Sequence, residues 1–100
     1  MSSSHYTEMT TYTWDEAKRK INLRDHGLDF KDAATVIENN SSLTIEDTRY
    51  HYNERRFLTP GFYDSLEVAI VYAERHYGLR IISFRKATRR ERLALFRANQ

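Results

Sequence analysis

The side chains of this sequence that could do chemistry are mainly arginines, and they are concentrated near the C-terminus. Residues 85–97 contain five arginines and one lysine against a single glutamate, although the whole chain has a net charge of only +2. A guanidinium group presents a planar fork of donors that matches two phosphate oxygens. We therefore expect residues 85–97 to form an anion-binding surface. The alternative is an arginine-rich surface that is merely solvated.

The elements that must position these arginines are a strand and a helix that follow each other directly. Leu79–Phe84 is rich in β-branched and aromatic residues and is too short for a stable helix, so it predicts a strand. Thr88 and Glu91 have the spacing of a capping box, in which each side chain bonds the backbone amide of the other residue. We expect a basic C-terminal helix that begins after Thr88 and ends near Ala98.

The N-terminal part of the chain predicts a tail, a strand and two helices. Residues 1–10 are polar and without periodicity, which is typical of a flexible tail. Thr11–Trp14 has strand character, and Asp15 can cap a helix that ends near His26, before Gly27. Ala17, Ile21 and Leu28 fall near one face of this helix. Asp29 can cap a second helix from Phe30 to about Glu38.

From residue 43 onward the hydrophobic period changes from that of a helix to that of a strand. Leu43–Ile45 and Arg55–Thr59 predict short strands, separated by a polar loop over residues 46–53. Pro60 and Gly61 are expected to end the second of them. Leu66–Glu74 predicts the longest and most apolar strand. We expect a single α+β domain over residues 11–100, with an antiparallel sheet, helices on one face and the other face partly open.

Composition excludes several classes of function. The chain has no cysteine and only three glycines, which excludes thiolate metal sites and gives no glycine-rich nucleotide loop. Its histidines have no ligand spacing, and its serines lack a nucleophile-elbow context. The longest apolar run, Val68–Ala73, is far below the ~20 residues of a membrane span. We expect a cytoplasmic protein that needs neither a metal nor an organic cofactor.

Two blocks of sequence resemble a known family. Near the C-terminus these are Arg80-Ile81-Ile82-Ser83, Arg85-Lys86-Ala87 and Thr88-Arg89-Arg90-Glu91-Arg92. Near the N-terminus they are Trp14-Asp15-Glu16-Ala17-Lys18, Asn22, His26-Gly27, Phe30 and Ala33-Ala34. With Glu74-Arg75 between them, these residues resemble the BrnT-like toxins, small ribonucleases of bacterial toxin–antitoxin pairs.

The resemblance implies a fold, an activity and a partner. The fold would be RelE-like, and the activity would be metal-independent cleavage of RNA that inhibits translation and growth. An antitoxin encoded nearby, BrnA-like and carrying a ribbon-helix-helix part, would neutralise the toxin. This chain would then bind DNA only through the antitoxin. The alternative function is a non-catalytic module that binds nucleic acid or the antitoxin.

RNA cleavage without a metal needs a base for the 2′-hydroxyl, an acid for the leaving oxygen and cations around the phosphorane. Arg56, Arg80 and Arg85 are the candidates for phosphate and transition-state stabilisation. Glu74 is the candidate general base or the orienter of an arginine, and His51 and His76 are weaker acid–base candidates. The pair Arg56-Phe57 matches the family's strand, but Arg55 occupies the position where an acidic residue is expected.

Strand alternation groups these candidates by face without showing which face is open. It places Tyr72 with Glu74, Ser83 with Arg85, and Arg80 with Ile82 and Phe84. The structural alternative for Glu74 is a surface pair with Arg75 or with an arginine across the sheet. For Arg80 it is a pair with Asp15 or Glu16.

Further residues are candidates for RNA binding outside the catalytic set. Tyr50 and Tyr52, in the predicted polar loop, could stack on unpaired bases. The remaining candidates are the basic residues Lys86, Arg89, Arg90 and Arg92. Their structural alternative is a solvated helix face, and an acidic antitoxin segment is an alternative partner for them.

Overall fold

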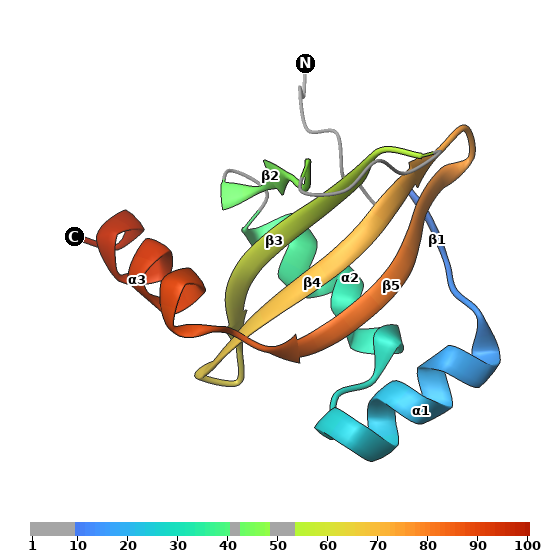
Figure 1. Ribbon diagram of the computed structural model, residues 1–100, viewed down its shortest axis with the longest axis horizontal. Helices are drawn as coiled ribbons and strands as arrows, with labels where there is room; N and C mark the ends of the chain where they lie inside the picture. The colour runs from blue at the N-terminus through green and yellow to red at the C-terminus, as the bar shows by residue number, and fades with distance from the viewer. Residues whose placement is uncertain (1–9, 41–42, 49–53) are drawn as a thin grey trace.

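The computed structural model describes residues 10–40, 43–48 and 54–100. Its elements are β1 (Thr11–Thr13), α1 (Glu16–His26), the 3₁₀ turn η1 (Phe30–Asp32), α2 (Ala33–Asn39), β2 (Ile45–Glu46), β3 (Arg56–Tyr63), β4 (Leu66–Arg75), β5 (Gly78–Lys86) and α3 (Arg89–Ala98) (Figure 1). The expected tail, apart from Thr10, and Tyr50, His51 and Tyr52 of the expected loop lie outside the described residues. No helix in the described part is long and apolar enough to cross a membrane.

The described strands form one five-stranded sheet in the order β1-β5-β4-β3-β2. Neighbouring strands are antiparallel except for β1, which runs parallel to β5 and pairs with Gly78–Arg80. The expectation of a purely antiparallel sheet was therefore wrong, whereas the α+β class is confirmed. Because β1 is joined to the rest of the sheet through helices and not through a hairpin, its direction is not dictated by a tight turn.

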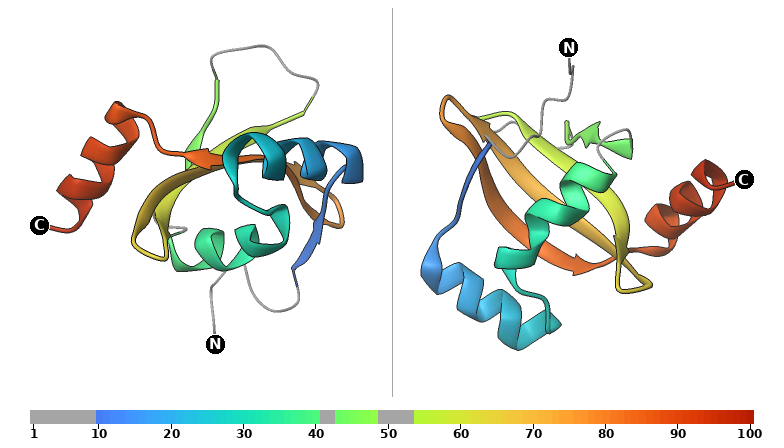
Figure 2. Two further views of the ribbon diagram at one scale, coloured as in Figure 1. Left: turned by 90° about the horizontal axis from the view of Figure 1, so that it is seen from below. Right: turned by 180° about the vertical axis from the view of Figure 1, so that it is seen from behind.

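Helix α2 covers one face of the sheet, as the view from behind shows, whereas α1 lies along the edge of β5 (Figure 2). The hydrophobic core fills the space beneath α2, with Phe30, Val36 and Ile37 packed against Ile70 and Phe84, among others. We call the opposite face, which α1 and α2 do not cover, the open face. The open face is where surface chemistry has room.

β3 does not end at Pro60 and Gly61, as the sequence predicted, but continues to Tyr63. β2 pairs only with Phe57 and Leu58, so Pro60 lies beyond the paired part of this edge and its missing N–H interrupts no pairing with β2. Gly61 is required by a close approach of α2, because a Cβ there would lie 2.6 Å from Nδ2 of Asn40. Pro60 and Gly61 are therefore compatible with this part of β3, and the strand continues through them.

Helix α1 is attached to the sheet by polar groups, which corrects the expected apolar face. Ile21 is 48% exposed, whereas Asn22 is buried. The Asn22 side chain donates to the carbonyl of Phe84 at 2.8 Å and accepts from the Phe84 amide at 3.2 Å. This amide completes the edge of β5 as a neighbouring strand would. The predicted cap at Asp15 and the left-handed Gly27 (φ 71°) are both confirmed.

Candidate active site

An irregularity in β5 brings Arg80 and Arg85 to the same face of the sheet. Val71 pairs with Ser83 but the next residue, Tyr72, pairs with Ile81, so Ile82 is an extra residue in β5. Ile81 and Phe84 consequently both lie in the core. The strict alternation expected from the sequence, which grouped Arg80 with Phe84, is wrong here because a bulge reverses the faces. Arg80, Ser83 and Arg85 all belong to the open face.

Arg56 and Arg80 lie in one row across the open face. In the sheet register Arg56 pairs with Ala73, and Ala73 pairs with Arg80. Residues paired across antiparallel strands share a face and lie close together. Ala73 is fully buried and small, so the two guanidinium groups can converge above it. Arg75, two residues after Ala73, belongs to the same face.

The three arginines meet at the carboxylate of Glu54, which precedes β3. Nη2 of Arg75 lies 2.6 Å from Oε1 of Glu54, Nε of Arg56 lies 3.2 Å from Oε2, and Nη2 of Arg80 lies 3.1 Å from Oε2. The side chain of Glu54 is only 14% exposed. Within the described residues, Nε of Arg80 is buried and has no hydrogen-bond partner. We call Glu54, Arg56, Arg75 and Arg80 the Glu54 cluster.

Charge in the Glu54 cluster is unbalanced in favour of the cations. Burial alone would raise the pKa of Glu54, but the hydrogen bond from Arg56 and the charges of Arg80 and Arg75 together lower it. Glu54 is therefore ionised at neutral pH. Among the described residues of the cluster, one negative charge faces three positive charges, and the excess of two is held on partly exposed arginines. This surface can accept a phosphate without a metal ion.

Glu74 does not lie with these arginines. It shares the face of Tyr72, as strand alternation predicted, and that is the face covered by α2. Its side chain is 54% exposed and lies 3.5 Å from Nη1 of Arg55. Arg55 also pairs with Glu46 at 3.2 Å. Glu74 thus belongs to a surface ion-pair group near the sheet edge, and Arg80 pairs with Glu54 and not with Asp15 or Glu16.

Arg85 lies on the open face but in a different environment. Its guanidinium donates twice to the carboxylate of Glu91, at 2.8 and 3.1 Å. The same carboxylate accepts from the amide of Thr88 at 2.8 Å, which completes the predicted capping box of α3. Burial opposes ionisation of Glu91, yet the bond from Arg85 and the Thr88 amide lower its pKa. Arg85 is therefore matched by one carboxylate that also begins a helix.

The basic residues after Arg85 lie around the start of α3. Lys86, Arg89, Arg90 and Arg92 are all exposed. Arg92 donates to the carbonyl of Ala87 at 3.1 Å and lies 3.9 Å from the carboxylate of Glu67. These side chains form a solvated basic rim at the end of β5 and on α3, beyond the Arg85–Glu91 pair. The predicted stacking residues Tyr50 and Tyr52, and His51, lie outside the described residues.

The remaining acid–base and metal candidates can be placed within the described residues. His76 is exposed in the turn between β4 and β5, one residue after Arg75, and its ring lies edge-on to Tyr77 at 5.3 Å. Across residues 10–40, 43–48 and 54–100, no three histidine, aspartate or glutamate side chains are grouped so that they could hold a metal ion. Among the described residues, the acid–base group in contact with all three arginines is Glu54.

Comparison with known proteins decides the family. A family model described as "Ribonuclease toxin, BrnT, of type II toxin-antitoxin system" matches residues 14–91. The chain belongs to the BrnT family. No curated protein sequence matches the chain. The matched region of this BrnT-family protein spans the whole Glu54 cluster and ends at Glu91, the partner of Arg85.

The N-terminal residues that carry the resemblance to BrnT toxins have structural roles in this chain. Asn22 closes the edge of β5, Gly27 ends α1, and Phe30 and Ala33 are buried in the core. These residues pack against the sheet and hold the helices in place beside it. The resemblance at this end of the chain therefore reports the fold, whereas the residues of the sheet carry the chemistry.

Two members of the Glu54 cluster, Glu54 and Arg75, were not among the residues predicted from the sequence. A signal for Glu54 was present, because an acidic residue was expected just before Arg56 and Arg55 occupied that position. Glu54 is two residues before Arg56, the spacing that keeps two side chains on one face of an extended chain. Arg75 was among the residues that carry the family resemblance, but its contact with Glu54, 21 positions earlier in the sequence, was not predictable from it.

Proposed function

We propose that this chain is a metal-independent endoribonuclease whose reaction takes place at the Glu54 cluster. The observation that carries the proposal is the convergence of Arg56, Arg75 and Arg80 on one ionised carboxylate. Membership of a family of type II toxin–antitoxin ribonuclease toxins supports it. The excess positive charge of the cluster also disfavours a bound metal cation, because three guanidinium groups already supply the charge that a metal would bring.

In this proposal the arginines bind the scissile phosphate and thereby activate Glu54. When they turn their donors toward phosphate oxygens, Glu54 loses the interactions that lower its pKa, and it becomes a stronger base. Glu54 then takes the proton of the 2′-hydroxyl, and the 2′-oxygen attacks phosphorus. The bond from phosphorus to the 5′-oxygen breaks, which leaves a 2′,3′-cyclic phosphate and a 5′-hydroxyl.

The leaving 5′-oxygen needs a proton, and we assign its donor to His76. This residue follows Arg75 at the end of β4 where the Glu54 cluster lies, and it is exposed to solvent. Glu74 is not assigned a catalytic role, because it lies on the other face of the sheet in contact with Arg55. His76→Ala should slow cleavage of a natural 5′-oxygen leaving group and leave a 5′-thio leaving group, which needs no proton, nearly unaffected.

Arg85 and the basic rim of Lys86, Arg89, Arg90 and Arg92 are proposed to hold the RNA strand beside the reacting phosphate. Cleavage by the free toxin would inhibit translation and growth in the cytoplasm. The family implies an antitoxin, and we propose that it is a BrnA-like protein with a ribbon-helix-helix part that covers the open face. DNA would then be bound through this antitoxin only.

The test is cleavage of single-stranded RNA by the purified chain in the presence of EDTA. We expect cleavage with cyclic-phosphate ends, lost in Arg80→Ala and retained in the matched control Glu74→Gln on the other face. Intact RNA with a folded wild-type chain, at concentrations that arrest growth in cells, would overturn the proposal. Salt-sensitive RNA retention without products would instead support the non-catalytic binding module.

A further inference from the structure

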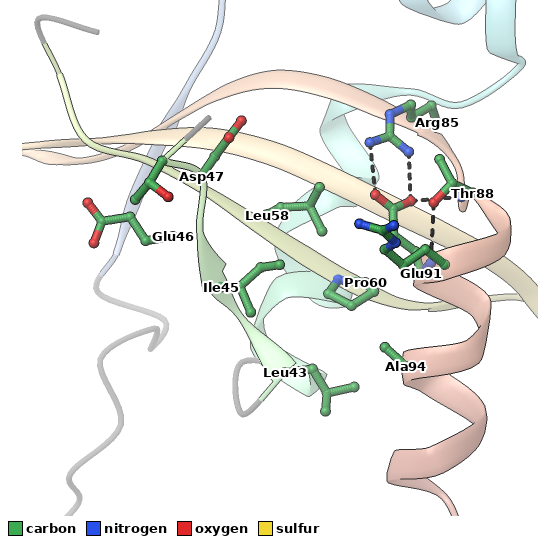
Figure 3. A pocket seen from close by; sticks show the side chains of 12 residues that line it. Leu43, Ile45, Glu46, Asp47, Leu58, Pro60, Arg85, Thr88, Glu91 and Ala94 are labelled. Atoms are coloured by element: carbon green, nitrogen blue, oxygen red, sulfur yellow. Dashed lines mark hydrogen bonds and ion pairs between the residues drawn. The ribbon is translucent and has the colours of Figure 1, made fainter. Parts of the chain in front are cut away.

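A groove on the open face has its floor on β3, the strand that also carries Arg56 of the Glu54 cluster. Leu58 and Pro60 of β3, both buried, form its floor, and its volume is about 470 Å³. Ile45 of β2, 61% exposed, lies on one wall, and Ala94 of α3 lies on the other (Figure 3). A mainly apolar cleft of this size is typical of a binding site for a small ligand or for one group of a larger ligand.

The groove continues from the arginines of the cluster along a single strand. Arg56, Leu58 and Pro60 are every second residue of β3 and therefore share one face of the sheet. The floor of the groove begins two residues after Arg56, the proposed phosphate ligand. Two residues of a strand span about 7 Å, which is close to the length of one extended nucleotide. An extended RNA strand whose phosphate lay on Arg56 and which followed β3 would therefore reach the groove within one nucleotide.

Of the two arginines that line the groove, Arg90 is the one available to a flanking phosphate of such a strand, because Arg85 is bonded to Glu91. Arg85 and Arg90 line one end, where Arg85 is held in place by Glu91, and Figure 3 shows this pair above the apolar floor. Glu46 and Asp47 line the other end. An apolar slot with arginines at its edge suits the two parts of a nucleotide, since the base is buried on apolar walls and the phosphate is paired outside.

We propose that this groove is a base-binding subsite, in which Ile45, Leu58 and Ala94 enclose one unpaired nucleobase next to the scissile phosphate. The inference rests on the proposed ribonuclease site, because it takes the phosphate position from Arg56. It gives the toxin a requirement for single-stranded RNA, since a base that is paired in a helix cannot enter the groove. Recognition by the groove uses the faces of the base more than its edges.

The experiment measures binding of a 2′-O-methyl oligoribonucleotide, which lacks the 2′-hydroxyl and cannot be cleaved by the proposed route. One base at a time is removed to leave an abasic position. In the wild type we expect one abasic position to weaken binding roughly tenfold, the scale of a base–side chain stacking contact. In Ala94→Trp, which fills the groove from an exposed position, the complete oligonucleotide should bind roughly tenfold more weakly, and that abasic position should have no further effect.

The matched control is Leu93→Trp, which adds an indole at an exposed position of α3 outside the groove lining. It should bind like the wild type. Ile45→Gln repeats the test from the opposite wall at another exposed position, so the outcome does not depend on one variant. Thermal unfolding of each variant separates loss of the groove from loss of the fold.

Two outcomes would overturn the subsite. One is an unchanged abasic penalty in Ala94→Trp and Ile45→Gln. The other is unchanged RNA binding in both variants together with weaker antitoxin binding, which would make the groove a protein-docking surface. Cleavage of unmodified RNA is measured separately, so the two proposals can fail independently. Base-dependent binding without cleavage would overturn the proposed ribonuclease activity and retain the base-binding subsite. Cleavage that is unaffected by filling the groove would retain the ribonuclease activity and overturn the subsite.

Discussion

Glu54 and Glu91 are two partly buried carboxylates on the open face, and both have pKa values lowered by arginine. Glu91 bonds one arginine and one helix amide, so its local charges cancel. Glu54 is shared by three arginines, so the Glu54 cluster itself keeps an excess of positive charge among the residues that the structure describes. The same pairing chemistry therefore stabilises a helix at one end of the sheet and leaves an anion site at the other. The number of arginines around each carboxylate decides whether the pair is charge-balanced or can bind a further anion.

The largest expected effect comes from removing an arginine at the end with excess charge. Arg80→Ala should lower kcat/KM for RNA cleavage by about 100-fold or more, the scale of losing one transition-state donor. Arg85→Ala, at the balanced end, should lower it less than about tenfold, mainly through KM. Steady-state kinetics of both variants test the contrast, and equal losses would show that the two ends act as one site.

Neutralising Glu54 should separate binding from chemistry. Glu54→Gln should lower kcat by roughly 100-fold, as expected for loss of a general base, while KM falls because the arginines lose a competitor for phosphate. The pKa of Glu54 lies below its ordinary value of 4.5. As pH falls through the lowered pKa, Glu54 becomes neutral and stops competing for the arginines, so RNA should bind more tightly to the wild type. Glu54→Gln should not show this change. Glu74→Gln, on the other face, serves as the control, and a higher KM in Glu54→Gln would contradict the assignment.

Glu91 should matter for stability more than for cleavage. Glu91→Gln should lower the free energy of unfolding by about 1–2 kcal/mol, because the capping box and the bond to Arg85 are both weakened. The folded-state pKa of Glu91 lies below its ordinary value of 4.5. The stabilisation by ionised Glu91 is therefore fully present above pH 4.5. It is lost as pH falls through the lower pKa that Glu91 has in the folded protein. Urea unfolding at pH 7 and at lower pH measures this difference.

The control for Glu91 is Glu67→Gln, whose contact with Arg92 is 3.9 Å long and exposed. Its expected effect on unfolding is below about 0.5 kcal/mol. A loss as large as that of Glu91→Gln would mean that α3 is held by its exposed ion pairs and not by its cap.

The smallest effects should come from the basic rim. Arg89→Ala or Arg90→Ala should weaken RNA binding a few-fold at low salt and reduce the slope of log K against log salt by about 0.7 for each phosphate that is no longer neutralised. Arg24→Ala, on the exposed side of α1 at the edge of β5, should leave the slope unchanged. Titrations at several salt concentrations check this, and an unchanged slope in the rim variants would place the RNA elsewhere.

The helix starts and stops could be predicted from the sequence because they depend on neighbours in the chain. Asp15, Gly27 and the Thr88–Glu91 box all have the predicted roles. The arginine-rich character of residues 85–97 was equally evident. The docking of α1 was not, because the buried contact is the polar Asn22 while the apolar Ile21 stays exposed. Hydrophobic periodicity cannot detect a helix that is held by an amide bonded to a strand edge.

The sequence by itself determined the α+β class, the local caps and the supply of arginines, since each follows from residues a few positions apart. Only the tertiary structure decided which arginines meet. Strand pairing placed Arg56, Arg75 and Arg80 around Glu54, and the extra residue Ile82 moved Arg80 to the open face. A bulge and a sheet register depend on contacts between distant segments, so the number of arginines at each carboxylate becomes fixed only when the sheet forms.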